Sequence, residues 1–272
     1  MCKIFLAAFS LLVFAPLDGG AAMLVAARAS FFISRAKRWT NPYVADGLVA
    51  MWDGEWNAGG GVHDPHATTW KNLVDGSSFG NGVSAASYPP VWGTDYCRNP
   101  SGVSGQKQVF SVAASAAAAQ SVACAEEVGC AVSVSSYVDG SWNCFQRFSV
   151  GVHFFRSSAV LTGGVVALWP SGKYQPWRAF NNSINALTPF TRRAYHTKLA
   201  PSDTMYLRMN NGTEYLLARG NGSTMTIPAT YPLLSAHSCV LECCCIRLYS
   251  RTLTAAEIAA NYAIDKARFN LS

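Results

Sequence analysis

The chain has 272 residues, of which 50% are hydrophobic and 13% are charged. This composition excludes a disordered or acidic-tail protein, because such chains lack the apolar residues that form a packed core. The net charge is +6 at pH 7, but five basic residues and one acidic residue lie in residues 1–38, so the body of the chain is nearly neutral. A nearly neutral body does not favour nucleic acid as a partner.

The first 40 residues form a hydrophobic N-terminal segment with two apolar runs. Residues 4–17 follow Lys3, and residues 21–34 are followed by a basic end. A positive start, an apolar run of this length and small residues after it are typical of a secretory signal peptide, here with cleavage near Ala22. The first run is too short for a membrane span, which needs about 20 apolar residues.

Two alternatives to export stay open for this segment. One is a retained hydrophobic helix for membrane association or for homo-oligomer assembly, because the apolar character continues beyond Ala22. The other is an ordinary packed helix. If the segment stays intact, Pro16 and the Gly19-Gly20 pair predict two short helices in place of one long helix, the second ending near Arg38.

The nine cysteines are odd in number and lack the paired spacing of a zinc site. They are expected to act as small core hydrophobes. One or two disulfides, for example Cys124 with Cys130, are the alternative if the protein is exported. If the triplet at 243–245 lies in a strand, Cys244 faces one side of the sheet, and Cys243 and Cys245 face the other.

From residue 46 onward, apolar and polar side chains alternate in several segments. Leu48, Ala50 and Trp52 share one face, and the alternation recurs at 130–138 and 148–154. A period of two residues is typical of strands that bury one side. The body of the chain is therefore expected to be an antiparallel sandwich.

Residues 205–218 predict a β-hairpin whose turn is Asn211-Gly212. Asn-Gly favours the two positive φ angles of a type I′ turn.

Near the C-terminus, a strand at 240–249 is expected to point Arg247 outward, between two aliphatic side chains that point inward.

A short C-terminal helix is expected directly after this strand. Thr254 and Glu257 have the spacing of a capping box, and Leu253 and Ile258 have that of a hydrophobic staple. The helix is expected to run for about three turns toward Arg268.

Four segments together resemble the laminin-G-like group of the concanavalin A-like lectin/glucanase superfamily, in versions found in gut-bacterial and prophage genomes. They are DGLVAMWDGEWN at 46–57, TTWKNLVDG at 68–76, MYLRMNNGTEYLLARG at 205–220 and IRLYSRTLTAAEIAANY at 246–262.

The resemblance covers residues 43–269, and the last segment is the most specific. It implies an all-β, two-sheet antiparallel jelly-roll sandwich with a short C-terminal helix. The domain division that follows is a hydrophobic segment at 1–40 and a sandwich domain at 43–269.

Glycosidase chemistry needs a pair of carboxylates that flank the scissile bond. The superfamily's glucanases carry Glu-x-Asp-x-x-Glu on one strand, and none of the six glutamates of this chain stands in that pattern. A Gly-x-Ser-x-Gly nucleophile elbow is also absent from the sequence. The sequence therefore predicts that the chain is not an enzyme.

Aromatic side chains in loops are the better signal for a ligand, because the apolar faces of sugars stack on aromatic rings. Trp52 and Trp70 are expected in the core instead. The candidate carbohydrate-binding residues are Trp56, Trp142, Tyr174, Trp177 and Asn181.

The acidic loop after residue 52 is a candidate site for calcium as a cofactor. Calcium binds several oxygen ligands, and Asp53, Glu55 and Asp64 offer carboxylates. The sequence does not complete a ligand set.

These patterns predict a binding module for carbohydrate recognition or adhesion at a cell or particle surface, with glycans or surface proteins as partners. The expected location is secreted or at the cell surface. The alternative is a structural component of a prophage particle, such as a tail-fibre or capsid accessory protein, that binds no small ligand. Fold alone does not decide between them.

Overall fold

The computed structural model describes residues 40–100, 106–115, 118, 122–133, 144–147, 153–154, 164–166, 178–179, 192–200, 204–219, 230–237 and 240–271. The chain divides into two compact units, Met1–Arg35 and Ala36–Ser272. The expectations for residues 1–39 lie outside the described residues and stay predictions. In the described part of the chain, no helix combines the length and the apolar character needed to cross a membrane.

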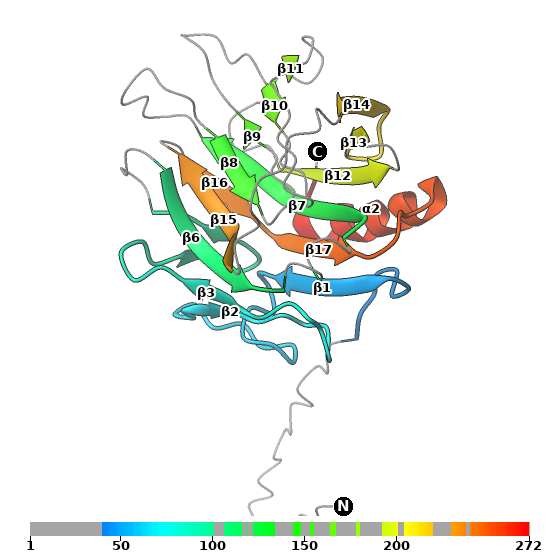
Figure 1. The fold of residues 1–272 in the computed structure, drawn as a ribbon. Helices are drawn as coiled ribbons and strands as arrows, with labels where there is room; N and C mark the ends of the chain where they lie inside the picture. Colours follow the sequence, from blue (N-terminus) through cyan, green and yellow to red (C-terminus); the bar gives the residue numbers. More distant parts are fainter. Residues whose placement is uncertain are drawn as a thin grey trace, which may run out of the picture. The chain divides into compact units, whose positions relative to one another are not determined.

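The larger of the sheets has nine strands. Its hydrogen-bonded order is β14-β13-β12-β7-β16-β5-β4, with β17 beside β7 and β1 beside β17. Figure 1 shows β12, β7, β17 and β1 side by side. All these pairs are antiparallel. The strands are β1 (Leu48–Asp53), β4 (Val91–Trp92), β5 (Cys97–Arg98), β7 (Cys124–Ser133), β12 (Arg193–Ala200), β13 (Thr204–Met209), β14 (Glu214–Arg219), β16 (Val240–Cys243) and β17 (Cys245–Tyr249).

A five-stranded antiparallel sheet, in the order β2-β3-β6-β15-β8, forms the second layer. Its strands are β2 (Thr69–Trp70), β3 (Gly82–Ser84), β6 (Gln106–Ala113), β8 (Cys144–Arg147) and β15 (Thr230–His237). Three short strands make a separate small sheet: β9 (His153–Phe154), β10 (Gly164–Val166) and β11 (Arg178–Ala179).

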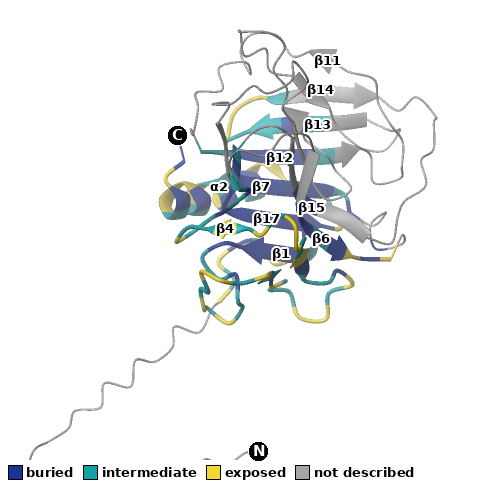
Figure 2. Ribbon diagram, turned by 90° about the vertical axis from the view of Figure 1, so that its left-hand side faces the viewer, coloured by how far each residue is buried: buried dark blue, intermediate teal, exposed yellow. Residues whose placement is uncertain are grey.

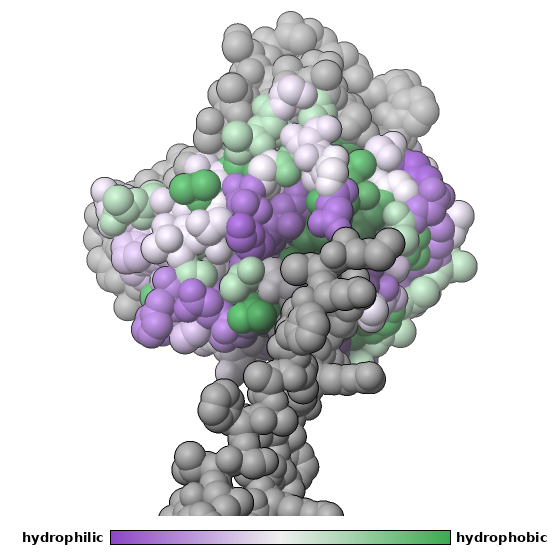
Figure 3. Space-filling model, turned by 90° about the horizontal axis from the view of Figure 1, so that it is seen from below, coloured by the Kyte–Doolittle hydropathy of each residue, from purple (hydrophilic) through white to green (hydrophobic). Residues whose placement is uncertain are grey.

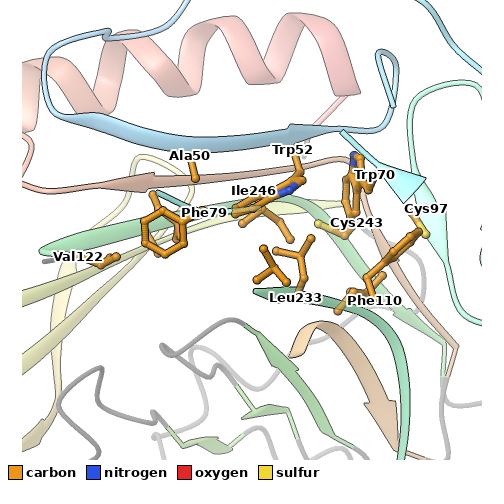
Figure 4. Close-up of a cluster of buried hydrophobic side chains, with 14 of the residues drawn as sticks. Ala50, Trp52, Trp70, Phe79, Cys97, Phe110, Val122, Leu233, Cys243 and Ile246 are labelled. Atoms are coloured by element: carbon orange, nitrogen blue, oxygen red, sulfur yellow. The ribbon is translucent and has the colours of Figure 1, made fainter. Parts of the chain in front are cut away.

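The main core lies between the two larger sheets (Figure 4). Trp52 and Ile246 come from the nine-stranded sheet, whereas Trp70, Phe110 and Leu233 come from the five-stranded sheet. Both tryptophans are 0% exposed, as expected from the sequence. The packing of two apolar sheet faces confirms the predicted antiparallel β-sandwich.

The first strand follows its predicted alternation only in part. Ala50 and Trp52 face the main core as expected, but Leu48 contacts the clusters on the opposite face. The pairing of β1 with β17 shifts register between Leu48 and Ala50. Because a bulge inserts one extra residue, it reverses the faces of the residues before it. The prediction for Leu48 was therefore wrong, and Val49 packs against the main core instead.

The predicted hairpin is present as β13 and β14, with Arg208 opposite Glu214. Its turn differs from the expected type I′, because the positive φ belongs to Asn210 (53°). The Asn210 amide donates to the Ala194 carbonyl oxygen, and its side-chain oxygen accepts from the Ala194 amide. These bonds to β12 fix Asn210, so tertiary contacts override the local Asn-Gly preference.

The C-terminal helix α2 (Ala255–Phe269) begins and ends as its sequence signals indicate. Thr254 and Glu257 form the reciprocal capping box, and Leu253 and Ile258 share a buried cluster. At 15 residues the helix is about four turns long, one more than expected. It packs on the outer face of the nine-stranded sheet against β7 and β12, and its buried side turns toward that sheet (Figure 2).

The cysteine triplet does not follow a simple strand. Cys244 lies in a bend between β16 and β17, where its amide donates to the Val128 carbonyl oxygen at 2.9 Å. Cys243 consequently faces the main core, whereas Cys244 and Cys245 both face the helix side. The expectation that Cys243 and Cys245 share a face was wrong, because the bend breaks the period of two.

Cys124 does not form the disulfide considered with Cys130. Both residues lie in β7, six positions apart, which separates them by about 20 Å in an extended strand. Cys124 is a free buried thiol whose Sγ contacts the Arg251 carbonyl oxygen at 3.3 Å.

Replacing Gly129 by alanine is expected to destabilise the fold. Gly129 has φ +66°, and a Cβ there would lie 2.2 Å from the Cys244 Sγ. The backbone strain alone costs roughly 1–2 kcal/mol, and the collision adds to it. Urea denaturation measures the change in the free energy of unfolding.

Gly76→Ala is the matched control for this variant. Gly76 has φ +70°, but no atom lies within 4 Å of the place that a Cβ would occupy. It therefore reports the backbone strain without the collision. Equal losses of stability in the two variants would contradict the close approach of Cys244 to Gly129.

Candidate functional site

The acidic loop after β1 closes around one arginine from α2. The Arg268 guanidinium donates to both Asp53 oxygens, at 2.9 and 3.2 Å, and to Glu55 Oε2 at 2.7 Å. Its carbon lies 4.1 Å from the centre of the Trp56 ring, and its Nη1 donates to Tyr43 Oη at 2.6 Å. The structure thus brings together three of the sequence candidates, Asp53, Glu55 and Trp56, and gives each an internal partner.

Asp53 is fully buried in this cluster. Burial raises the pKa of its carboxyl group, and the charge of Arg268 opposes that rise. Two carboxylates and an aromatic face around one guanidinium make a neutralised, hydrogen-bonded anchor for the end of α2. The carbohydrate prediction for Trp56 stays a prediction.

Asp64 belongs to a different part of the same loop. Its amide donates to Asn57 Oδ1, its carbonyl oxygen accepts from Asn57 Nδ2, and its Oδ1 accepts from the His66 amide. These bonds shape the loop. Across the residues that the structure describes, no three His, Cys, Asp or Glu side chains gather as a metal-binding group. The calcium prediction stays untested.

The other four carbohydrate candidates, Trp142, Tyr174, Trp177 and Asn181, lie outside the described residues. The structure therefore says nothing of their placement, and they stay predictions.

A buried charge network lies between α2 and the sheet. Arg247 is 0% exposed. Its Nε donates to Glu126 Oε2 at 2.7 Å, and its Nη1 donates to Asp265 Oδ1 at 2.8 Å. Asn261 also donates to Glu126 Oε2, at 2.9 Å. Arg247 points away from the sandwich core as predicted, but the helix covers it.

The network holds Glu126 in its charged form. Burial alone raises the pKa of Glu126, but the charge and hydrogen bond of Arg247 oppose this rise, and His196, whose Nδ1 lies 3.4 Å from Glu126 Oε1, also lowers the pKa. The net result is a pKa lowered to about 2. Closed ion networks of this kind fix the packing of elements.

Sequence reasoning missed this network, although a signal for it exists. Ile258, Asn261 and Asp265 recur at helical spacing and form the buried stripe of α2 together with Phe269. Polar residues at buried stripe positions need partners on the opposing face. They therefore indicate matching charges on the sheet.

An open pocket of about 250 Å³ lies at the edge of the sandwich. Apolar walls and a polar loop enclose it. It is lined by Leu48, Val49, Val74, Asp75, Gly76, Ser77, Ser78, Phe79 and Ala118.

The polar loop of this pocket is fixed by its own hydrogen bonds. Ser77 Oγ donates to the Val49 carbonyl oxygen at 2.5 Å and accepts from the Phe79 amide at 3.1 Å. Asp75 and Ser78 are exposed and so can meet a ligand. The sequence analysis assigned no ligand role to this stretch, although its first residues belong to the segment at 68–76 that carries the family resemblance.

Elsewhere on the described surface, the exposed large apolar side chains are isolated from one another. They are Val62, Val83 and Val91. Figure 3 shows one face on which hydrophilic and hydrophobic residues are intermixed. Single exposed apolar residues are normal on soluble proteins, so the edge pocket is the better candidate for a binding site.

No protein-family model and no curated protein matches the chain. Among solved structures it is similar to the Trypanosoma rangeli sialidase in complex with sialic acid, with 12% identity and a TM-score of 0.45 over 79% of this chain and 32% of that chain. It is similar to the binding domain of Paraclostridial Mosquitocidal Protein 1, with 12% identity and a TM-score of 0.49 over 79% of this chain and 52% of that chain.

A third similar structure is described as a receptor binding domain, with 8% identity and a TM-score of 0.40 over 62% of this chain and 42% of that chain. The chain spans about a third of the length of the sialidase chains it matches. All three TM-scores lie below 0.5, so these likenesses do not assign the chain to the laminin-G-like group.

The prediction that the chain is not an enzyme needs correction. Several of the similar solved structures are sialidases, which are enzymes. The prediction relied on one glucanase pattern and one hydrolase motif, and neither covers all ways of building a catalytic site on a sandwich fold. The exclusion of enzymatic activity is therefore withdrawn.

Proposed function

We propose that this chain is a module that binds carbohydrate, as free glycans or on the surface of a cell or particle, and that its edge pocket holds one sugar unit. The observation that carries the proposal is the pocket of about 250 Å³, in which exposed polar side chains stand over apolar walls. Sugars present hydroxyl groups on their rims and apolar C–H groups on their faces, so such a mixed lining suits them.

The two polar side chains have complementary roles. The Asp75 carboxylate accepts hydrogen bonds from sugar hydroxyls, and the Ser78 hydroxyl both donates and accepts. The loop between them is held by Ser77, whose hydroxyl is bonded to Val49 and Phe79. A site whose backbone is already fixed loses little conformational entropy on binding.

The proposed location is outside the cell, either secreted or at the cell surface. It rests on the signal-like pattern of the N-terminal segment. A glycan-binding role agrees with such a location.

The proposal predicts that Asp75→Ala lowers the affinity for a bound glycan by at least about tenfold, because hydrogen bonds to a charged group contribute roughly 1.5–3 kcal/mol. A glycan array with the full chain identifies the sugar, and titration calorimetry then measures the affinity of each variant. Ser78→Ala is expected to weaken binding less, since its hydrogen bonds are neutral.

Glu214→Gln is the charge control. Glu214 lies on β14 and pairs with Lys198 at 2.7 Å, and its carboxylate does not line the pocket. Binding that survives Asp75→Ala but is lost in Trp142→Ala or Trp177→Ala would move the site to the aromatic loops. Binding to no glycan would refute the proposed function.

A further inference from the structure

Two cysteines that are far apart in the sequence face each other across neighbouring strands. Cys97 of β5 stands directly opposite Cys243 of β16 in the antiparallel register. Residues opposed in this way project to the same face, and their Cα atoms are about 4.5–5.5 Å apart. A disulfide needs a Cα separation of roughly 4.4–6.8 Å, so the backbone already meets the main condition for a bond.

Both side chains lie in the same part of the main core. Each residue is 0% exposed, and the two belong to one cluster (Figure 4). Burial first, and the neighbouring Cys243 thiol second, raise the pKa of the Cys97 thiol well above its usual value. This electrostatic effect of one thiol on the other agrees with their opposition in the strand register.

Weak contacts hold the two sulfurs in the reduced protein. Cys97 Sγ lies 3.8 Å from the Arg98 carbonyl oxygen, and Cys243 Sγ lies 3.6 Å from the carbonyl oxygens of Val128 and Cys245. Thiols are weak donors. Rotation about χ1 therefore costs little in lost hydrogen bonds when the sulfurs turn toward each other.

No other two cysteines oppose each other in the described strands. Cys124 stands opposite Tyr249 and Lys198, and Cys245 stands opposite Asp53 and Val128. The register of these strands thus singles out one pair of cysteines.

We propose that Cys97 and Cys243 form a cross-strand disulfide when the chain folds in an oxidising environment. The thiols lose two protons and two electrons, and the S–S bond forms through a mixed disulfide with a small-molecule disulfide such as oxidised glutathione, which is reduced to two thiols. The reaction occurs before the core closes, because buried thiols of raised pKa are inert.

The bond would fix an edge of the larger sheet that consists of very short strands. β4 and β5 have two residues each, and β4 is the outermost strand on that side. Short edge strands open more readily than central ones. With a covalent link from β5 to β16, this edge can separate from the sheet only when the core unfolds as well. The link also closes a long loop in the unfolded chain, which lowers the entropy of that state.

The test is to refold the full chain in a mixture of reduced and oxidised glutathione, block the free thiols by alkylation and map the peptides without reduction. We expect a linked pair of peptides that contains Cys97 and Cys243, about 2 Da lighter than the two reduced peptides together. The oxidised chain is expected to melt about 5 °C or more above the reduced chain, and dithiothreitol is expected to abolish this gain.

Cys97→Ser and Cys243→Ser should each lose the linked peptides and the thermal gain, whereas Cys124→Ser, a buried free cysteine with no opposing thiol, should keep both. If either serine variant fails to fold, the peptide map of the unaltered chain decides by itself. Full alkylation of Cys97 and Cys243 after refolding, or a bond from Cys97 to any other cysteine, would overturn the proposal.

Discussion

Replacing Arg247 by methionine is expected to lower the free energy of unfolding by roughly 3–5 kcal/mol, because removing one partner of a buried ion network leaves uncompensated charges. Glu126 and Asp265 would each lose a charged hydrogen bond in a region closed to water. The stacking of the guanidinium over Tyr43, at 3.8 Å from the ring centre, would also be lost. Urea denaturation of the purified chain measures the effect.

Two further variants make this result specific. Arg208→Met removes an arginine whose ion pair with Glu214 is longer, at 3.8 Å, and partly exposed, so its cost is expected to stay below about 1 kcal/mol. Arg247→Met combined with Glu126→Gln and Asp265→Asn removes all three charges and should recover a large part of the loss. If Arg247→Met costs no more than Arg208→Met, the network does not hold α2 on the sheet.

Acidification is expected to remove about 3 kcal/mol of stability that depends on Glu126. Its folded pKa is about 2, against a usual value of 4.5. A lowered pKa in the folded state means that the stabilising contribution is fully present above the unfolded value. It is therefore lost as the pH falls from about 4.5 toward 2, when the carboxylate takes up a proton and its bond with Arg247 weakens.

The check is a pair of stability curves against pH, one for the unaltered chain and one for Glu126→Gln. The difference between them cancels the titration of the other carboxylates, including Asp265, whose pKa burial raises. The difference should be largest near neutral pH and should vanish near pH 2. A difference that stays constant from pH 7 to pH 2 would show that Glu126 gains no stability from its charge.

The sequence predicts best where the determining contacts are local. Thr254 and Glu257 are three residues apart, and their reciprocal hydrogen bonds fix the start of α2 without help from distant elements. Ala50 and Trp52 follow the alternation of a strand with one buried face. The alternation in the strand at 240–249 likewise predicts that Arg247 points away from the sandwich core. These signals depend on a few neighbouring residues, and the structure confirms each of them.

The candidate sites depended on contacts that no local pattern contains. The sequence predicts Asp53, Glu55 and Trp56 as ligand-binding residues, but Arg268 contacts all three from the far end of the chain. The edge pocket forms where the loop that carries Asp75 meets the start of β1. A single sequence does not say which loop meets which strand.

The sequence by itself determined the antiparallel sandwich, the hairpin and the capped helix, because periodicity and capping act over a few residues. Only the tertiary structure decided that Arg247 is buried, since its burial results from the docking of α2 over the outer face of the sheet. The same holds for Cys97 and Cys243, which lie about half the chain apart in the sequence and are brought together by the order of the strands. Burial and long-range pairing are properties of the packed layers, so they appear only when the sheets and the helix are assembled.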